Sequence, residues 1–136
     1  MSKLFRLRIL AAERPFYEGE CSAVTVPLED GEYGILAMHY DIIAAIVPGL
    51  LRFTTPEGEE RIAAVGAGMV KVEKGEVLVL ADTVERPEEI DENRARRALV
   101  AAREALLQKQ SYAEYRLTQS ELARAANRLK VKHREI

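Results

Sequence analysis

The first part of the chain has the two-residue period of β-strands. Phe5, Leu7 and Ile9 alternate with Arg6 and Arg8, as expected of a strand with one buried and one solvated face. Short apolar runs follow at residues 22–28, 41–47, 50–54, 61–65, 69–73 and 77–81, with turn signals of Gly, Pro and acidic residues between them. This spacing predicts a β-sandwich or a β-barrel.

Two glycines, Gly66 and Gly68, stand between the runs at 61–65 and 69–73. A phosphate-binding loop would need a Lys-Ser or Lys-Thr pair and a following helix, and the sequence has neither here. Glycine between strand segments is typical of a bulge or of a close approach by another backbone segment, so we expect one of these.

A helical pattern replaces the strand pattern after residue 84. Pro87 and the acidic residues Glu88, Glu89, Asp91 and Glu92 have the composition of a helix start, and no Gly or Pro follows to the C-terminus. Because small side chains dominate one face of this predicted helix, a second helix could approach it closely. The face consists of Ala95, Ala98, Ala102, Ala105 and Leu106.

A second helix is predicted from Ser111. Ser111 and Glu114 have the spacing of a capping box, and only two or three residues around Gln110 connect the helices, so the two should run antiparallel. An alanine-rich interface gains little, at about 0.8 kcal/mol per buried CH₂ group, so a ligand or partner could displace this hairpin. The apolar stripe of the second helix consists of Tyr115, Leu122, Ala125 and Leu129.

Composition limits the classes of function. The 136 residues are enough for one modest core and an appendage. Cys21 is the single cysteine and His39 and His133 are the only histidines, so the sequence offers neither an intramolecular disulfide nor a metal cluster. No apolar run approaches the roughly 20 residues of a membrane helix, and we expect no direct membrane insertion.

Charge is divided unequally along the chain. Residues 1–93 contain 9 Lys and Arg against 18 Asp and Glu, a net charge of −9, whereas residues 94–136 contain 11 against 4, a net charge of +7. The two parts could attract each other, or the basic part could bind an acidic partner.

Few residues suggest catalysis. His39 has no Ser or Cys beside it in a nucleophile context, and Glu59-Glu60 and Glu88-Glu89 stand in turn or helix-start segments where carboxylates are solvated. We therefore find no active site and expect a protein that acts by binding partners.

A group of arginines suits an anion. Arg124 and Arg128 are four residues apart on the predicted second helix, and Arg94 could face them from the first. The alternative is a set of surface charges paired with Glu121 and its neighbours. Asp91 could accept hydrogen bonds from an adenine or a ribose, or it could cap the helix.

Five segments, taken in order, carry a family resemblance. They are GEYGILAMH at 31–39, VPGLLRF at 47–53, AVGAGMVKV at 64–72, VLVLADTVER at 77–86 and IDENRARRA at 90–98. From about Phe5 to Val131 the chain resembles the epsilon subunit of bacterial F-type ATP synthases. This resemblance implies an antiparallel, mainly β, sandwich over residues 1–84 and a C-terminal antiparallel α-helical hairpin over residues 85–136.

The resemblance also implies a role and partners. The chain would be a non-catalytic subunit of the central stalk, at the cytoplasmic face of the bacterial plasma membrane as a peripheral part of the ATP synthase. Its sandwich would bind the gamma subunit and the c-subunit ring, so that proton-driven rotation reaches the catalytic head. Its mobile hairpin would bind an acidic segment of the beta subunits and inhibit ATP hydrolysis.

Two residues of the sandwich are given partner contacts by the resemblance. The family's turn Gly-Glu-x-Gly falls at Gly31-Glu32-Tyr33-Gly34, which implies that Glu32 lies near the c ring. The histidine of the family's Pro-Gly-His falls at His39, near gamma, while Ala37 and Met38 replace the proline and glycine.

The resemblance implies a regulatory ATP site as well, with ATP as a ligand and no required cofactor. Some members bind ATP through Ile/Leu-Asp-x-x-Arg-Ala and later arginines, and residues 90–95 match this motif in full. A further basic residue of those members, seven positions after the motif arginine, is Ala101 here, and Arg103 follows two residues later. The implied site consists of Glu85, Ile90, Asp91, Arg94, Arg124 and Arg128.

Two other interpretations remain open. A nucleic-acid-binding module could use the basic hairpin to follow phosphates, although the acidic first part and the pI near 5.8 argue against it. An enzyme would require a polar pocket built around His39.

Overall fold

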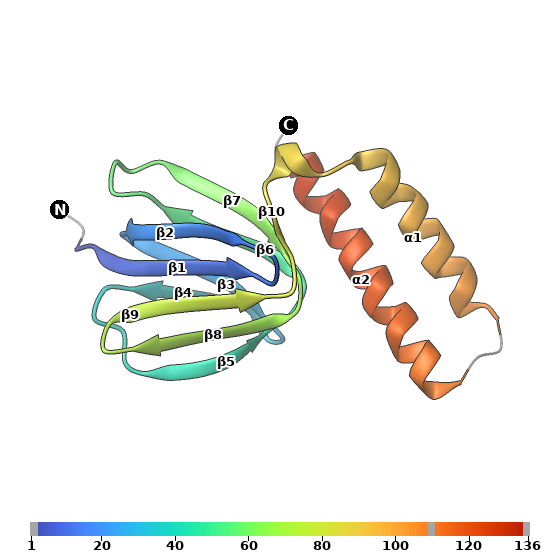
Figure 1. Ribbon diagram of the computed structural model, residues 1–136, viewed down its shortest axis with the longest axis horizontal. Coiled ribbons are helices and arrows are strands. Elements are labelled where there is room, and N and C mark those ends of the chain that lie inside the picture. Colours follow the sequence, from blue (N-terminus) through green and yellow to red (C-terminus); the bar gives the residue numbers. More distant parts are fainter. Residues whose placement is uncertain (1–2, 109–110, 135–136) are drawn as a thin grey trace. The chain divides into compact units, whose positions relative to one another are not determined.

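The computed structural model describes residues 3–108 and 111–134 (Figure 1). It divides into two compact units, Met1–Glu85 and Arg86–Ile136, which are described separately. The predicted helix connection around Gln110 lies outside the described residues.

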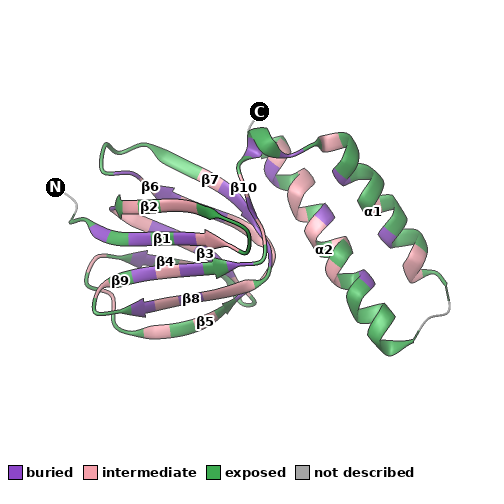
Figure 2. Cartoon of the chain, viewed as in Figure 1, coloured by how far each residue is buried: buried purple, intermediate pink, exposed green. Residues whose placement is uncertain are grey.

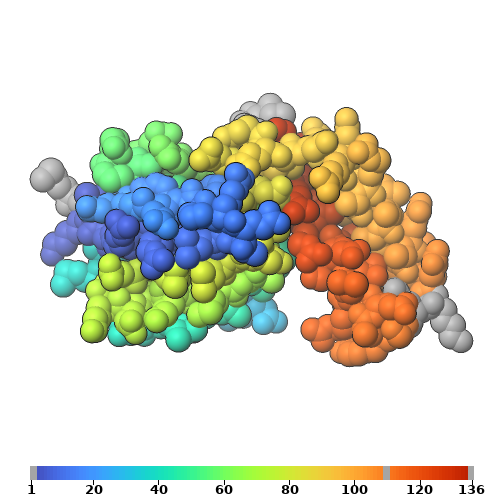
Figure 3. Space-filling model, in the orientation of Figure 1, coloured from blue at the N-terminus to red at the C-terminus, as the bar shows by residue number. Residues whose placement is uncertain are grey.

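The first unit is a β-sandwich, which resolves the choice between sandwich and barrel. Its two sheets have the strand orders β2-β1-β9-β8-β5 and β10-β7-β6-β3-β4, and β1 pairs with β9 in parallel while the other pairs are antiparallel. The strands are β1 (Phe5–Ala11), β2 (Pro15–Cys21), β3 (Ala23–Leu28), β4 (Gly31–Leu36), β5 (Ile42–Ile46), β6 (Gly49–Thr54), β7 (Glu60–Val65), β8 (Gly68–Glu73), β9 (Glu76–Ala81) and β10 (Val84–Glu85). In Figure 3 the blue N-terminal segment accordingly lies beside the yellow-green segment of β8 and β9.

The core lies between the sheets and follows the predicted alternation. Leu7 and Ile9 are fully buried and Phe5 nearly so, whereas Arg6 and Arg8 are exposed. Figure 2 shows buried segments on strands of both sheets. The buried side chains are mainly aliphatic, so area removed from water, at about 25 cal/mol per Å², is the main force that holds the sheets together.

The hydrophobic pattern did not predict β2, β4 or the two-residue β10. Residues 31–34 were expected to form a turn, but Gly31–Leu36 is strand β4, paired along its length with β3. Within this segment only Gly31 has a positive φ, 125°, so the turn ends where the strand begins.

The predicted close approach at Gly66 and Gly68 is confirmed. A Cβ atom at Gly68 would overlap the backbone of Leu80 and Ala81 on β9, and one at Gly66 would overlap the side chains of Asp82 and Thr83. Glycine at 68 therefore lets the start of β8 lie close beside β9, and glycine at 66 leaves room for the side chains of Asp82 and Thr83.

The second unit is a helical hairpin with capped helices. A short 3₁₀ helix, η1 (Pro87–Glu89), precedes α1 (Glu92–Leu106) and α2 (Tyr112–Arg134). Ser111 Oγ accepts a hydrogen bond from the amide of Glu114 over 3.2 Å, which confirms the predicted start of the second helix.

The packed face of the hairpin is narrow. Figure 2 shows that most of both helices is exposed. The buried residues are Ala95 and Ala102 on α1 and Thr118, Ala125 and Val131 on α2. Two expected members of the interface, Ala98 and Tyr115, are exposed instead, whereas Leu99 is half-buried. Ala98 and Leu99 lie equally far around the helix from the stripe of Ala95 and Ala102, on opposite sides of it, so helix period alone does not choose between them.

No helix in the described part of the chain is both long enough and apolar enough to span a membrane.

Candidate functional site

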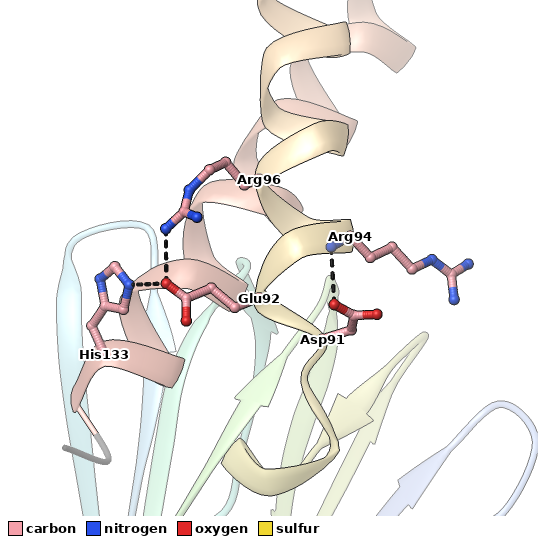
Figure 4. Close-up of polar contacts among 5 residues, drawn as sticks. All are labelled: Asp91, Glu92, Arg94, Arg96 and His133. Carbon is pink, nitrogen blue, oxygen red and sulfur yellow. Dashed lines mark hydrogen bonds and ion pairs between the residues drawn. The ribbon is translucent and has the colours of Figure 1, made fainter.

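Asp91 caps the first helix. Its Oδ1 accepts a hydrogen bond from the backbone N of Arg94 over 3.0 Å, which satisfies one of the free amides of the first turn (Figure 4). Ile90, beside it, is only 4% exposed and anchors the turn by packing. Asp91 thus has the capping role that the sequence allowed, and its second carboxylate oxygen is not used by the cap.

Arg94 lies on the opposite flank of α1 from Glu92 and Arg96. An α-helix turns about 100° per residue, so Arg94 lies about 100° around the axis of α1 from the buried Ala95. Glu92 and Arg96 lie about 60° and about 100° from Ala95 in the opposite direction. Figure 4 shows the Arg94 side chain extending away from Glu92, Arg96 and His133. Within the described residues its guanidinium has no hydrogen-bond or ion-pair partner.

Arg124 and Arg128 share that flank of the hairpin. Arg124 and Arg128 lie about 100° and about 60° around the axis of α2 from the buried Ala125, and His133 lies on the other side of Ala125. His133 contacts Glu92 on α1. When two antiparallel helices pack along their length, a contact between one side of each helix shows which sides of the pair are adjacent. Arg94, Arg124 and Arg128 therefore point to the same side, which we call the arginine flank.

The arginine flank is partly sheltered. Arg124 and Arg128 are half-buried and each takes part in an interaction, whereas Arg94 is exposed. Arg94 is two residues beyond Glu92 on α1, and Arg128 is five residues before His133 on α2. Because a helix rises about 1.5 Å per residue, Arg94 and Arg128 lie within about 5 Å of each other along the helix axes. Guanidinium groups are the side chains that bind phosphates best, so these three arginines are the candidate anion-binding residues of the hairpin.

Ala101 also belongs to this flank. It is nine residues beyond Glu92 on α1, and Arg124 is nine residues before His133 on α2, so the two face each other at the same level. Arg103 lies on the other flank, about 80° from Ala95 in the opposite direction. Arg103 therefore cannot take the place of a basic residue at 101.

Glu85 belongs to the sandwich unit. It pairs with Ala64 as the last residue of β10 and is half-buried. Of the six residues of the implied ATP site, the hairpin holds Ile90, Asp91, Arg94, Arg124 and Arg128.

The other flank of the hairpin carries a polar cluster that the sequence analysis missed. Glu92 Oε1 accepts hydrogen bonds from His133 Nε2 and from Arg96 Nη2, each over 2.8 Å (Figure 4). These contacts, that of His133 first, lower the pKa of the Glu92 carboxyl group below its ordinary value. Glu92 and Arg96 have the helical i, i+4 spacing, but no local signal connects either to His133.

Glu32 is exposed on β4 and bound by a neighbour. Arg52 on β6 donates from Nη2 to Glu32 Oε2 over 2.6 Å. The carboxylate thus has a fixed direction on the surface of the sheet, which suits a contact with a partner.

His39 lies in the β4–β5 connection with both ring nitrogens engaged. Nδ1 is 2.7 Å from the Tyr40 carbonyl, which can only accept, so Nδ1 donates this hydrogen bond, and Nε2 is hydrogen-bonded to the Tyr33 hydroxyl over 2.8 Å. Met38, before it, has a φ of 64° and is 77% exposed.

Family models match both parts of the chain. The model described as ATP synthase, Delta/Epsilon chain, beta-sandwich domain matches residues 4–87, and the model for the long alpha-helix domain of the same chain matches residues 88–133. The chain belongs to the delta/epsilon family of ATP synthase subunits.

The relatives named ATP synthase epsilon chain confirm the more specific resemblance. The protein of Ruminiclostridium cellulolyticum is 40% identical over 130 residues, 96% of this chain and 96% of its own length. That of Thioalkalivibrio sulfidiphilus is 37% identical over 132 residues, 96% of this chain and 94% of its own. The likeness to epsilon subunits thus runs through both units.

Solved structures share the fold. A chain of the Euglena gracilis mitochondrial ATP synthase, in a complex of OSCP, F1 and c-ring, aligns with a TM-score of 0.76 at 24% identity, over 89% of this chain and 76% of that one. A chain of the Tetrahymena thermophila central stalk and c-ring aligns with a TM-score of 0.72 at 11% identity, over 96% and 98%.

Proposed function

We propose that this protein is a non-catalytic subunit of the central stalk, in which residues 1–84 bind the rotor and residues 85–136 regulate it. The sandwich binds the gamma subunit and the c-subunit ring, with Glu32 toward the ring and His39 toward gamma, and so transmits rotation to the catalytic head. The complex lies at the cytoplasmic face of the bacterial plasma membrane. Family membership supports this proposal over the nucleic-acid alternative.

The hairpin inhibits ATP hydrolysis by leaving its compact form and binding the beta subunits. The hairpin interface supports this inhibitory role, because the two buried residues of α1 are both alanines. Such an interface buries little apolar area, so a partner that offers an acidic surface to the +7 segment can separate the helices.

Hydrolysis by the complex tests the inhibitory role. ATP synthase stripped of this chain should hydrolyse ATP faster than complex to which the chain is returned. A variant with Arg116, Lys130 and Arg134 changed to Gln removes exposed positive charge from α2 without touching the arginine flank. It should inhibit several-fold less at equal concentration, at about 0.2–1 kcal/mol per exposed charge contact. Equal inhibition by the variant and the native chain would contradict the proposed contact.

The arginine flank binds ATP and holds the hairpin compact. Arg94, Arg124 and Arg128 contact the phosphates, and the free oxygen of Asp91 accepts from the adenine or the ribose. Ile90 fixes the turn that precedes α1. The position of three arginines on one flank of the hairpin supports this site. Two of these arginines belong to α2 and one to α1.

Calorimetric titration with ATP, with and without magnesium, tests the nucleotide site. Arg94→Ala and Arg124→Ala should each weaken binding about tenfold or more, since a hydrogen bond to a charged group is worth roughly 1.5–3 kcal/mol. Arg103→Ala, on the other flank, is the matched control and should bind like the native chain. No heat up to millimolar ATP would exclude the site and leave the stalk role untouched.

A further inference from the structure

The Glu92–His133 contact joins two ends of the hairpin. Glu92 lies in the first turn of α1 and His133 in the last turn of α2, 41 residues later. The two side chains meet at 2.8 Å, and Arg96 donates to the same oxygen of Glu92 (Figure 4). One carboxylate therefore connects the beginning of the hairpin to its end.

The chemistry of this contact depends on the imidazole. An ionised carboxylate only accepts hydrogen bonds, so Nε2 of His133 must carry a proton. A neutral ring protonated at Nε2 satisfies this condition, and so does the imidazolium ion, but the ion forms a charge-assisted bond that is roughly twice as strong. The same contacts lower the pKa of the Glu92 carboxyl group and so favour its ionised form.

The helix dipoles favour the charged forms of both groups. An anion is favourable at a helix N-terminus and a cation at a C-terminus. The antiparallel pairing brings the first turn of α1, with Glu92, beside the last turn of α2, with His133. The ion pair thus lies where both helices stabilise its charges.

Other charged groups surround the contact. From α1 the facing groups are Glu92 and Arg96, and on α2 itself Lys132 donates to the Pro87 carbonyl, which ties the same turn to η1. The remaining ionic groups on η1 and on the last turn of α2 are Arg86, Glu88, Glu89, Lys130 and Arg134, of which Arg86 and Glu89 pair at 3.9 Å. Glu92 is thus the carboxylate in direct contact with His133.

We propose that Glu92 and His133 form a pH-dependent clasp, which tightens on acidification and holds α2 against α1. The imidazolium form makes the stronger, charge-assisted bond to the Glu92 carboxylate, and the share of that form grows as pH falls. A fall from about pH 8 to about pH 6 therefore closes the hairpin more firmly. The clasp is a property of the hairpin alone; its effect on hydrolysis rests on the function proposed above.

Amide hydrogen exchange of α1 and α2 in the full-length chain, without nucleotide, tests the clasp. After correction for the pH dependence of intrinsic exchange, the protection of both helices should rise roughly two- to fivefold between about pH 8 and about pH 6, the range of an exposed ion pair. Protection that is equal at the two pH values would overturn the proposal. Because no ATP is present, this outcome is independent of the calorimetric test above.

Variants assign the response to the two residues. His133→Gln and Glu92→Gln should each abolish the pH response, whereas His39→Gln, which removes the other histidine of the chain, should retain it. A response that survives in His133→Gln would overturn the proposal, as would its loss in His39→Gln.

If the hairpin of the Gln variants is unfolded at both pH values, a variant with a permanent positive charge at residue 133 still tests the proposal. His133→Lys keeps a positive charge at both, so its protection should be the same at about pH 8 as at about pH 6. A pH response that persists in His133→Lys would assign it to another group and exclude the clasp.

Discussion

The guanidinium of Arg52 reaches across strand β3 to donate to the carboxylate of Glu32, from Nη2 to Oε2 over 2.6 Å. Thr25 on β3 pairs with Arg52 on one side and with Gly34 on the other. Glu32 is two residues before Gly34 on β4 and pairs with Pro27, the next residue but one after Thr25 on β3. The contact links three strands near the edge of the sheet.

Glu32→Gln should lower the free energy of unfolding of the sandwich by about 0.5–1 kcal/mol, because the amide keeps the shape but removes the charge that Arg52 contacts. Urea unfolding measures the change. The matched control is Glu59→Gln, whose carboxylate is 3.6 Å from Arg61 on a more exposed surface, and which should change stability by only a few tenths of a kcal/mol. Equal effects in the two variants would mean that the short contact has no special weight.

Met38→Gly should stabilise the sandwich by about 0.5–1 kcal/mol. Met38 holds a φ of 64°, which is unfavourable for a residue with a Cβ, and its exposed side chain contributes little packing. Thermal unfolding measures the gain. Ala37→Gly, at a position without positive φ, should destabilise instead because glycine gains entropy in the unfolded chain. A loss of stability in both variants would contradict the explanation from strain.

Cys21 should be inert in the folded protein. Burial raises the pKa of its thiol to about 12, and an unfolded thiol titrates near pH 8.5. At about pH 8, alkylation by iodoacetamide should be about three orders of magnitude slower than in denaturant, since only the thiolate reacts. Comparable rates in both conditions would show that the site opens readily.

The same thiol makes stability fall with pH. Above about pH 8.5 the unfolded chain loses the proton and the folded chain keeps it, so the unfolding free energy should decrease by roughly 1.4 kcal/mol per pH unit from this group. The slope between about pH 9 and 10 should be smaller by this amount in Cys21→Ala, which is less stable but has no thiol to titrate. An unchanged slope would contradict the prediction.

Ala101→Arg should raise the affinity for ATP about three- to tenfold, if the arginine flank binds phosphate, because it places a fourth guanidinium opposite Arg124. Calorimetry of the full-length chain measures the change. Val100→Arg is the control: residue 100 is 46% exposed and points away from α2. An equal gain in the two variants would indicate attraction by net charge and not a built site.

Most of the sandwich could be predicted because its central strands have strong alternation. The strands that the sequence analysis missed, β2, β4 and the two-residue β10, all lie at sheet edges. An edge strand buries fewer side chains, so its sequence can include residues such as Pro15, Gly19, Gly31 and Gly34 that weaken a strand pattern. The physical reason for the misses is thus low burial, and not an exception to the period of strands.

The candidate site was predictable to the extent that it depends on helix period. Asp91 as a cap, and the arginines at 94, 124 and 128, follow from spacing and composition. The Glu92–His133 contact could not be found this way, because it needs the relative height of two helices, which no local pattern sets. Ala98 was misplaced for a related reason, since a three-or-four spacing fits two adjacent stripes and only packing selects one.

The position of β1 between β2 and β9 has a consequence for the biogenesis of the protein. Leu7 pairs with Val77 in parallel, so a strand made at the start of synthesis stays incomplete on one side until about 70 more residues have left the ribosome. Closing so long a loop is slow, in the range of milliseconds to seconds for all-β topologies, whereas the helices that follow need only local contacts and microseconds. The nascent chain therefore exposes an open strand edge until β9 arrives, and the hairpin, although synthesised after β9, does not limit the rate of folding.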